Sequence, residues 1–340
     1  MNEADLERRY RRLLAWYPWS HRRVYEDEML AVLVTAARPG QRWPTLGEAG
    51  NLVASGLRAR AGAAVTAAVS PPWRAAATVF GLFAAIVLLS QRVVRLFDIA
   101  PPGSGAYLRA LGWAAVVLAV LVGLRRSAAT IAWLTALGEV VLVARQYGGD
   151  PVSAVHLMWP LALGLFAAAA LSVATERVGG VLRLRRVLLF AGGVALAQTV
   201  LLTNRHAQWN WREAGTFYAN YGLAARSEAV FYLLLAAVLV GFLASALAWL
   251  TLPVAIRWRA LALATPVITV AALVKVTLSG WEYSNWNMGH PIYLVPIQWT
   301  LLAVLPLASL GIAAALVERR ELTARLSALG RAADRDQATG

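Results

Sequence analysis

Long blocks of consecutive apolar residues recur along most of the chain, and they limit the fold more than any other feature. A helix advances about 1.5 Å per residue, so about 20 apolar residues cross the hydrocarbon core of a bilayer. Lipid offers no hydrogen-bond partners, so a spanning segment must satisfy its own backbone amides, which favours helices. Only 15% of the residues are charged, whereas a soluble domain has about a quarter. The sequence therefore predicts an all-α, polytopic membrane helix bundle.

About eight blocks meet this length requirement. The predicted spans are residues 73–91, 106–124, 127–145, 155–175, 187–204, 229–250, 260–279 and 293–316. The second and third are separated only by Arg125-Arg126, which requires a tight hairpin. Four prolines fall inside predicted spans, where each removes a backbone hydrogen bond: Pro160, Pro266, Pro296 and Pro306.

The arginines lie mainly in the gaps between the apolar blocks, where they act as topology signals and contact lipid headgroups. Most of them fall on the side that holds both termini. The positive-inside rule therefore predicts a multi-pass protein of the cell membrane with cytoplasmic N- and C-termini. The net charge of +14 is explained in this way, and no direct nucleic-acid binding is expected.

The stretch before the first span, residues 1–70, is predicted to form a cytoplasmic domain of three short helices. Its first helix has apolar residues on one face: Leu6, Tyr10, Leu13, Leu14 and Tyr17. Thr45 and Glu48 have the spacing of a capping box, which predicts that the third helix starts there. Residues 71–316 form the transmembrane bundle, and residues 317–340 are predicted to be a cytoplasmic amphipathic tail.

Enzymatic chemistry has little support in the sequence. The chain has no cysteine, which excludes disulfides, thiolate zinc sites, iron–sulfur clusters and cysteine nucleophiles. No nucleotide-binding fingerprint or nucleophile elbow is present. The histidines and carboxylates predicted on the outward side, such as His156, His206, His290, Asp150 and Glu282, do not have the spacing of a metal site. We therefore expect a non-enzymatic protein without a metal or cofactor.

Two predicted outward loops combine aromatic side chains with asparagines. The candidate ligand-binding residues are Trp209, Asn210, Trp211 and Tyr218 in the first loop and Trp281, Tyr283, Trp286 and Asn287 in the second. Aromatic faces stack on sugars or peptides while amides form hydrogen bonds, which suits a ligand surface. The alternative is an aromatic belt at the membrane interface, where Trp and Tyr are enriched.

Among the charged residues inside predicted spans, Glu139 in the third and Lys275 in the seventh lie farthest from the span ends. An isolated charge at such depth costs about 2.5–3.5 kcal/mol. Both residues are in the outer half of the membrane, so an ion pair between them is geometrically allowed and would reduce this cost. The alternatives are a proton or ion relay, or no contact between the two.

The N-terminal stretch carries a family resemblance. The relevant segments are Tyr10-Arg11-Arg12-Leu13-Leu14-Ala15-Trp16-Tyr17-Pro18 and Arg22-Arg23-Val24-Tyr25-Glu26-Asp27-Glu28-Met29-Leu30. This pattern resembles the helical prefix of many actinobacterial membrane proteins and of some bacterial permeases. It is also similar in plan to cytoplasmic domains of membrane proteins paired with transcription regulators. The permeases with this prefix carry large extracytoplasmic domains, which this chain lacks.

Read from the residues themselves, the acidic side chains Glu26, Asp27 and Glu28 could bind a basic partner, and together with Arg22 they are the candidate partner-binding residues of the prefix. The alternative is that these acidic residues pair with nearby arginines. We predict a regulatory or sensor protein whose prefix holds a sigma factor or similar regulator, and whose outward loops sense a ligand or the envelope state. Two further hypotheses are a transport protein or export or immunity subunit working with a separate ATPase, and an enzyme using the outward histidines.

Overall fold

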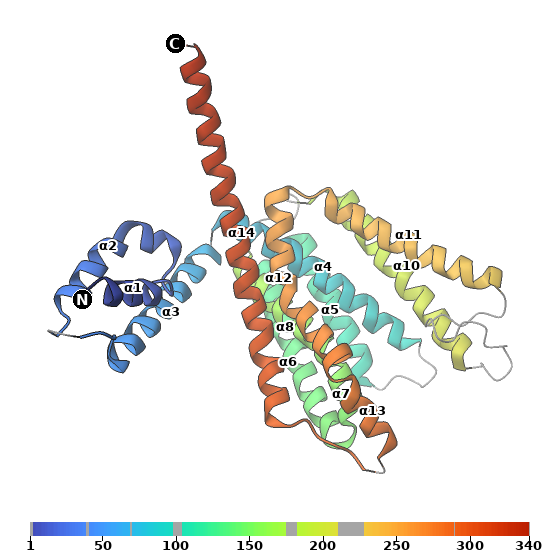
Figure 1. Ribbon diagram of the computed structural model, residues 1–340. Coiled ribbons are helices and arrows are strands. Elements are labelled where there is room, and N and C mark those ends of the chain that lie inside the picture. Colours follow the sequence, from blue (N-terminus) through green and yellow to red (C-terminus); the bar gives the residue numbers. More distant parts are fainter. Residues whose placement is uncertain are drawn as a thin grey trace. The chain divides into compact units, whose positions relative to one another are not determined.

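The computed structural model describes residues 3–38, 41–68, 70–97, 104–174, 182–209, 228–288 and 290–339. Every regular element in these ranges is a helix (Figure 1). The chain divides into two compact units, Met1–Ser70 and Pro71–Gly340.

The unit Met1–Ser70 contains helices α1 (Glu3–Leu14), α2 (Trp19–Thr35) and α3 (Leu46–Ala68). Its core consists of Leu6, Tyr10, Leu14, Tyr17, Leu30 and Leu52. Four of the five residues of the predicted apolar face are thus buried, and Leu13 packs against them. The apolar spacing of the first helix therefore identified the core correctly.

The capping box predicted at the start of α3 is present. The amide of Glu48 donates to the hydroxyl of Thr45 at 3.2 Å, and the amide of Thr45 donates to the Glu48 carboxylate at 2.8 Å. The hydroxyl of Tyr10 donates to the same carboxylate at 2.9 Å, so the cap also ties α3 to α1. Burial raises the pKa of Tyr10 to about 12.

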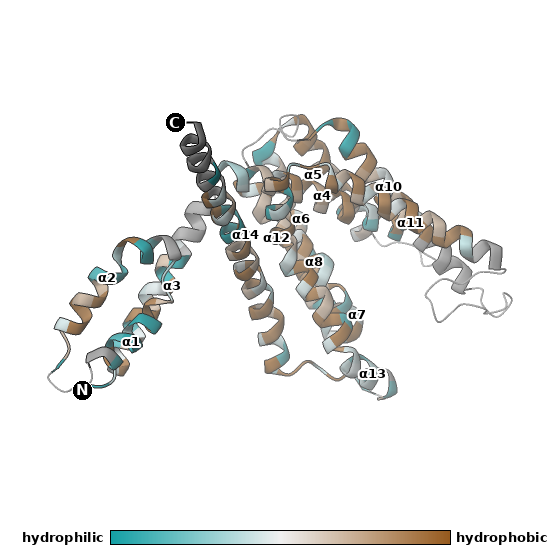
Figure 2. Ribbon diagram, turned by 45° about the horizontal axis from the view of Figure 1, so that its top comes forward, coloured by the Kyte–Doolittle hydropathy of each residue, from teal (hydrophilic) through white to brown (hydrophobic). Residues whose placement is uncertain are grey.

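The unit Pro71–Gly340 is a helix bundle. Its elements are α4 (Pro71–Leu96), α5 (Ser104–Val122), α6 (Arg125–Gly149), α7 (Pro151–His156), α8 (Met158–Val173), α10 (Leu184–Trp209), α11 (Glu228–Leu250), α12 (Val254–Ala272), the π-helix η2 (Leu273–Thr277), α13 (Ser279–Asn287) and α14 (Pro296–Thr339). Each predicted span lies largely on these helices, and the seventh, 260–279, extends from α12 through η2 to the start of α13. Figure 2 shows hydrophobic colouring along α8, α11 and much of α14.

Among the described residues, 7 helical segments are long and apolar enough to cross a membrane. They are Pro71–Leu96, Gly105–Val122, Arg125–Gly149, Pro151–Val173, Tyr232–Leu250, Val254–Thr277 and Pro296–Ala324. Helix α10, at the position of the predicted fifth span, is not among them. The chain is therefore an all-helical multi-pass membrane protein, with a span count roughly consistent with the predicted eight.

The structure changes three details. The predicted fourth span is two helices, because α7 ends at His156 and α8 begins at Met158. The predicted loop after the seventh span contains the short helix α13. The predicted tail, residues 317–340, is not a separate element, since α14 continues from the last span to Thr339.

The hairpin between α5 and α6 shows why the chain can reverse there. Gly123 has φ 88°, a left-handed conformation that costs glycine little. The amide of Leu124 donates to the carbonyl of Ala119 at 2.8 Å, and that of Gly123 to the carbonyl of Val120 at 3.2 Å. This is a Schellman motif, which satisfies the last carbonyls of α5 before α6 begins.

Helix α4 lies at the centre of the bundle and packs against α5, α8, α10 and α12. The rings of Phe83 on α4 and Phe190 on α10 stack with centroids 3.9 Å apart. Helix α10 also crosses α11 closely, because Gly193 and Gly241 face each other there. A Cβ atom on Gly241 would lie 2.7 Å from the carbonyl oxygen of Gly193, so glycine is needed for this crossing.

Candidate functional site

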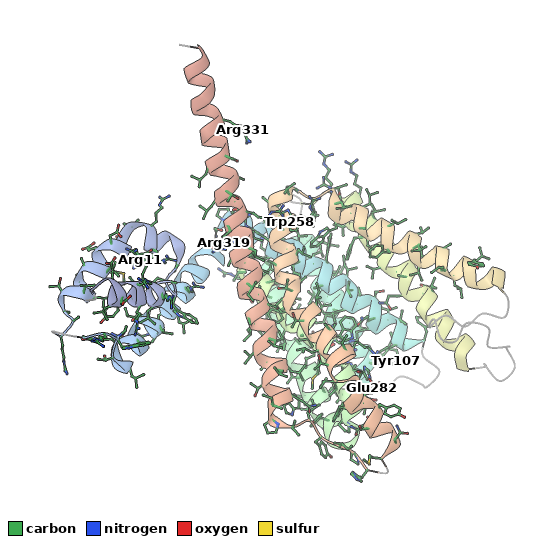
Figure 3. All side chains as sticks on the ribbon, viewed as in Figure 1. Arg11, Tyr107, Trp258, Glu282, Arg319 and Arg331 are labelled. Atoms are coloured by element: carbon green, nitrogen blue, oxygen red, sulfur yellow. The ribbon has the colours of Figure 1, made fainter. Side chains whose placement is uncertain are left out.

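A cluster of polar residues lies where η2, α13 and α7 meet, which we call the α13 end of the bundle. His156 Nε2 is 2.8 Å from Glu282 Oε1, and Lys275 Nζ is 3.3 Å from His156 Nδ1. We refer to His156, Lys275 and Glu282 as the His156 triad. Figure 3 shows Glu282 and Trp258 at opposite ends of the α12–α13 column.

The elements that carry the triad have unusual local structure. His156 is the last residue of α7, whose N-terminus is capped by the Asp150 side chain accepting from the Ser153 amide at 3.0 Å. The hydrogen bonds from Ser153 lower the pKa of Asp150 below its ordinary value, so this carboxylate stays charged. Lys275 lies in the single π-helical turn η2. Such turns occur frequently at functional sites.

The chemistry of the side chains determines the protonation pattern of the triad. A charged lysine can only donate hydrogen bonds, so His156 Nδ1 must accept from Lys275. The remaining proton of the neutral imidazole then resides on Nε2, which donates to Glu282. This assignment follows from the hydrogen-bond network. The three residues therefore form one chain of hydrogen bonds, from ammonium through neutral imidazole to carboxylate.

The loop between α13 and α14 is fastened to α13. The indole of Trp281 donates to the carbonyl of Ile292 at 3.1 Å. The side-chain oxygen of Asn285 accepts from the Ile292 amide at 2.8 Å, and its NH₂ group donates to the Ile292 carbonyl at 3.2 Å. Trp281 and Asn285 of α13 thus form hydrogen bonds with both the backbone amide and the backbone carbonyl of Ile292.

The same loop is fastened to the C-terminal end of α6. The hydroxyl of Tyr147 accepts from the Leu294 amide at 2.8 Å, and the hydroxyl of Tyr293 donates to the Gly148 carbonyl at 3.0 Å. The rings of Tyr147 and Tyr293 lie 5.5 Å apart. These contacts hold the α13 end together across residues more than 140 positions apart.

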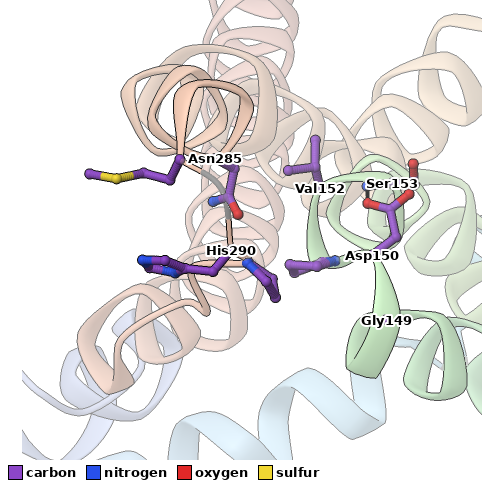
Figure 4. Close-up of a pocket in the computed structure, with 9 residues that line it drawn as sticks. Gly149, Asp150, Val152, Ser153, Asn285 and His290 are labelled. Atoms are coloured by element: carbon purple, nitrogen blue, oxygen red, sulfur yellow. Dashed lines mark hydrogen bonds between the residues drawn. The ribbon is translucent and has the colours of Figure 1, made fainter.

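A cavity of about 360 Å³ opens between the start of α7 and the loop after α13 (Figure 4). It is lined by Gly149, Asp150, Pro151, Val152, Ser153, Asn285, Met288, His290 and Pro291. The lining combines a charged carboxylate, an imidazole and an amide with apolar side chains, a mixture typical of small-ligand sites.

The structure places the predicted ligand-binding residues in different environments, and it describes the side chains of only some of them. Trp281 is used to hold the loop, and Asn287 donates to the Tyr283 carbonyl of its own helix at 2.7 Å. Tyr283 is 70% exposed. The side chain of Trp286 is outside the described part of the chain, as are the Trp209 side chain and residues Asn210, Trp211 and Tyr218. The ligand-surface hypothesis for these residues therefore stays a prediction.

The expected ion pair between Glu139 and Lys275 is corrected, because each residue has another partner. Glu139 Oε1 accepts from Arg92 Nη2 at 2.8 Å and Arg92 Nε at 2.9 Å, and from the Trp113 indole at 3.2 Å. All three side chains are buried. This contact joins α4, α5 and α6, and Lys275 belongs to the His156 triad instead. Arg92 directly follows the first predicted span, 73–91, and no feature of the sequence predicted its burial.

The candidate partner-binding residues of α2 separate into two groups. Arg22 and Glu26 form a salt bridge at 3.0 Å, as the structural alternative proposed. Asp27 and Glu28 have exposed side chains. Of these candidates, Asp27 and Glu28 therefore present exposed carboxylates, whereas the Glu26 carboxylate is paired with Arg22.

The triad itself was not predicted as a unit. His156 and Glu282 were noted only among scattered outward residues, and they are 126 positions apart. The one local signal was a lysine inside an apolar span. In the part of the chain that the structure describes, no three histidine, aspartate or glutamate side chains gather in a way that could hold a metal ion.

Comparisons with family models, with curated proteins and with solved structures return no match.

Proposed function

We propose that this chain is a non-enzymatic sensor of the cell membrane that carries a signal from outside to a cytoplasmic regulator. In this proposal the α13 end faces outward and receives the signal. The unit Met1–Ser70 faces the cytoplasm and binds the regulator, a sigma factor or similar protein. The observation that carries the proposal is the His156 triad, which joins three separate segments through polar contacts at one end of the bundle.

The distribution of basic residues supports this orientation. Arginines cluster before the first span and around the connections at residues 125–126, 183–186 and 257–259. The positive-inside rule assigns such connections to the cytoplasm. The α13 end lies at the other ends of the same helices, and so faces outward in this proposal.

The exposed carboxylates of Asp27 and Glu28 support a basic partner for the prefix. Val24 and Val32, each 63% exposed, add apolar surface on the same helix. The resemblance to prefixes of regulator-associated membrane proteins agrees with this assignment. A separate ATPase is the alternative partner, in which case the chain is a transport or export subunit.

The transport alternative drew on Glu139 and Lys275 as an intramembrane relay and on the prolines inside the spans. The contacts of Glu139 weaken the first of these arguments. Glu139 instead forms a buried ion pair with Arg92, a contact suited to holding α4 and α6 together. We therefore favour the sensor.

Orientation can be tested directly because the chain contains no cysteine. Single cysteines at Asn287 on α13 and Ser327 on α14, both exposed positions, give matched probes. In intact cells a membrane-impermeant maleimide should label Asn287→Cys only, and Ser327→Cys should react after the membrane is permeabilised. Labelling of Ser327→Cys in intact cells would reverse the proposed topology.

The partner is tested with the full chain, cross-linked in native membranes and purified. We expect a soluble regulatory protein to be recovered with the wild type and lost with the double charge reversal Asp27→Arg/Glu28→Arg. Glu7→Arg on α1 is the matched charge-reversal control and should retain the partner. Equal recovery with all three proteins, or recovery of no regulator, would contradict the assignment.

A further inference from the structure

We infer that the signal received at the α13 end is the proton, and that His156 is the group that binds it. The inference rests on the proposed sensor function and names its stimulus. Imidazole is the side chain that ordinarily changes charge between about pH 5 and 8. The geometry around His156 makes that change of charge incompatible with one of its two contacts.

Neutral His156 uses both ring nitrogens. Nδ1 accepts from Lys275 at 3.3 Å, and Nε2–H donates to Glu282 at 2.8 Å. When the ring binds a proton, both nitrogens become donors. Nδ1–H then faces an ammonium group that has no acceptor, and two positive charges lie within about 4 Å, where they repel. The Lys275 contact must break, while the Glu282 contact becomes charge-assisted and stronger.

Charged groups of both signs lie around the ring. Glu282 from α13 contacts it directly, and the charge of Asp150 at the start of α7 interacts with it electrostatically. Lys275 from η2 is the opposing charge. Further titratable groups of this end are His290, which lines the neighbouring cavity with Asp150, Tyr147 of α6, whose hydroxyl is bound to the loop, Tyr293 of that loop and Tyr283 of α13.

Protonation therefore exchanges one connection for another. The link between α7 and η2 is lost, and the link between α7 and α13 is strengthened. Lys275 is free to move because its side chain is exposed and η2 is a single π-helical turn. In acid η2 is then held to α7 only by the apolar cluster that contains Val155 and Val274, and this weaker contact allows η2 to move away from α7.

Helix α12 connects this event to the opposite end of the bundle. It continues directly into η2, and near its start Arg259 forms an ion pair with Glu321 of α14. The guanidinium of Arg320 lies 4.4 Å from the centre of the neighbouring Trp258 ring. Helix α12, which continues into η2 and so to Lys275, is thus linked by an ion pair to the part of α14 that continues beyond the bundle.

The test uses the full chain reconstituted in vesicles of phosphatidylcholine and phosphatidylglycerol, with ¹⁵N-labelled histidine. Near pH 8, nitrogen NMR should show His156 as the Nε2–H tautomer, and acidification to pH 5 should convert it to the imidazolium. Spin labels attached at Val276→Cys on η2 and Val152→Cys on α7 should move apart over the same pH range. An unchanged distance across this range would overturn the inference.

Three variants distinguish a proton switch from a structural contact. His156→Gln offers an oxygen to Lys275 and an NH₂ group to Glu282, so it should keep the neutral arrangement and lose the pH response. His290→Gln is the matched control and should keep it. Lys275→Met removes the opposing charge and Glu282→Gln removes the supporting one, so the two variants should change the pH response in opposite directions. Shifts in the same direction would refute the charge argument.

Two experimental outcomes separate a wrong stimulus from a wrong function. If the regulator is recovered with the prefix but neither pH nor His156→Gln affects it or the spin-label distance, the sensor remains and the proton is not its stimulus. If the distance responds to pH but no regulator is recovered at any pH, the proton site stands and the proposed partner is wrong.

Discussion

The buried contact between Arg92 and Glu139 gives the sharpest stability prediction. Arg92 is 4% exposed and Glu139 is 2% exposed, and their closest atoms are 2.8 Å apart. At an effective dielectric constant of about 20, two unit charges at this separation attract by about 6 kcal/mol. Removing each ion from water costs several kcal/mol, so the pair as a whole is close to neutral for stability.

Breaking the pair by changing one partner is different, because the remaining charge stays buried without its ion-pair partner. We expect Glu139→Ala or Arg92→Ala to lower the free energy of unfolding by about 3–5 kcal/mol. Glu139→Ala also leaves the Trp113 indole N–H without its acceptor. Glu139→Gln keeps an acceptor oxygen and should cost less than Glu139→Ala.

The double variant Arg92→Met/Glu139→Met tests the reasoning, since it removes both charges and keeps similar volume. It should recover to within about 1–3 kcal/mol of the wild type, the remaining loss being the unpaired indole N–H. The assay is equilibrium unfolding of the purified chain in mixed micelles, followed by circular dichroism. Single variants within about 1 kcal/mol of the wild type, or additive effects in the double variant, would refute the buried-charge argument.

Three further predictions concern other parts of the chain. Gly241→Leu should destabilise the α10–α11 crossing by about 1–3 kcal/mol in the same micellar unfolding assay, because its Cβ would meet the Gly193 carbonyl, whereas Gly192→Leu, with no atom within 4 Å, should not. Asn285→Ala should raise hydrogen exchange in the loop after α13, with α4 unchanged, because the Ile292 amide loses its acceptor and the Ile292 carbonyl keeps only the Trp281 indole. The pKa of Glu48 is lowered, chiefly by a backbone hydrogen bond with Thr45. The charged carboxylate therefore stabilises the fold fully above its ordinary pKa of 4.5, and this stabilisation is lost as the pH falls through the lowered pKa. Hydrogen-exchange protection of α3 should fall over that pH range in the wild type and should depend less on pH in Glu48→Gln.

The fold class could be predicted from sequence because its signal is local. A span is recognised from the hydropathy of about 20 neighbouring residues, and no knowledge of the partner helices is needed. The same holds for the apolar face of α1 and the capping box of α3, which depend on spacings of three or four residues. Helix ends were less accurate, since the continuation of α14 to Thr339 has no strong local stop signal.

The charged contacts of the bundle depended on the tertiary structure. From sequence, Glu139 and Lys275 were the charges farthest from the ends of their spans and so the natural pair. Arg92 lay at the edge of its predicted span, where a long side chain ordinarily reaches the interface. Its guanidinium instead turns inward to Glu139, because α4 is surrounded by other helices.

The apolar blocks of this chain therefore determined by themselves that it is a helical membrane protein, since burying backbone in lipid permits few alternatives. Which polar side chains meet was decided only by the packing of the helices. Glu139 and Arg92 are 47 positions apart, and His156 and Glu282 are 126 apart. No local pattern encodes such pairs, because the helix positions that face each other are set by the side chains of all the neighbouring helices together.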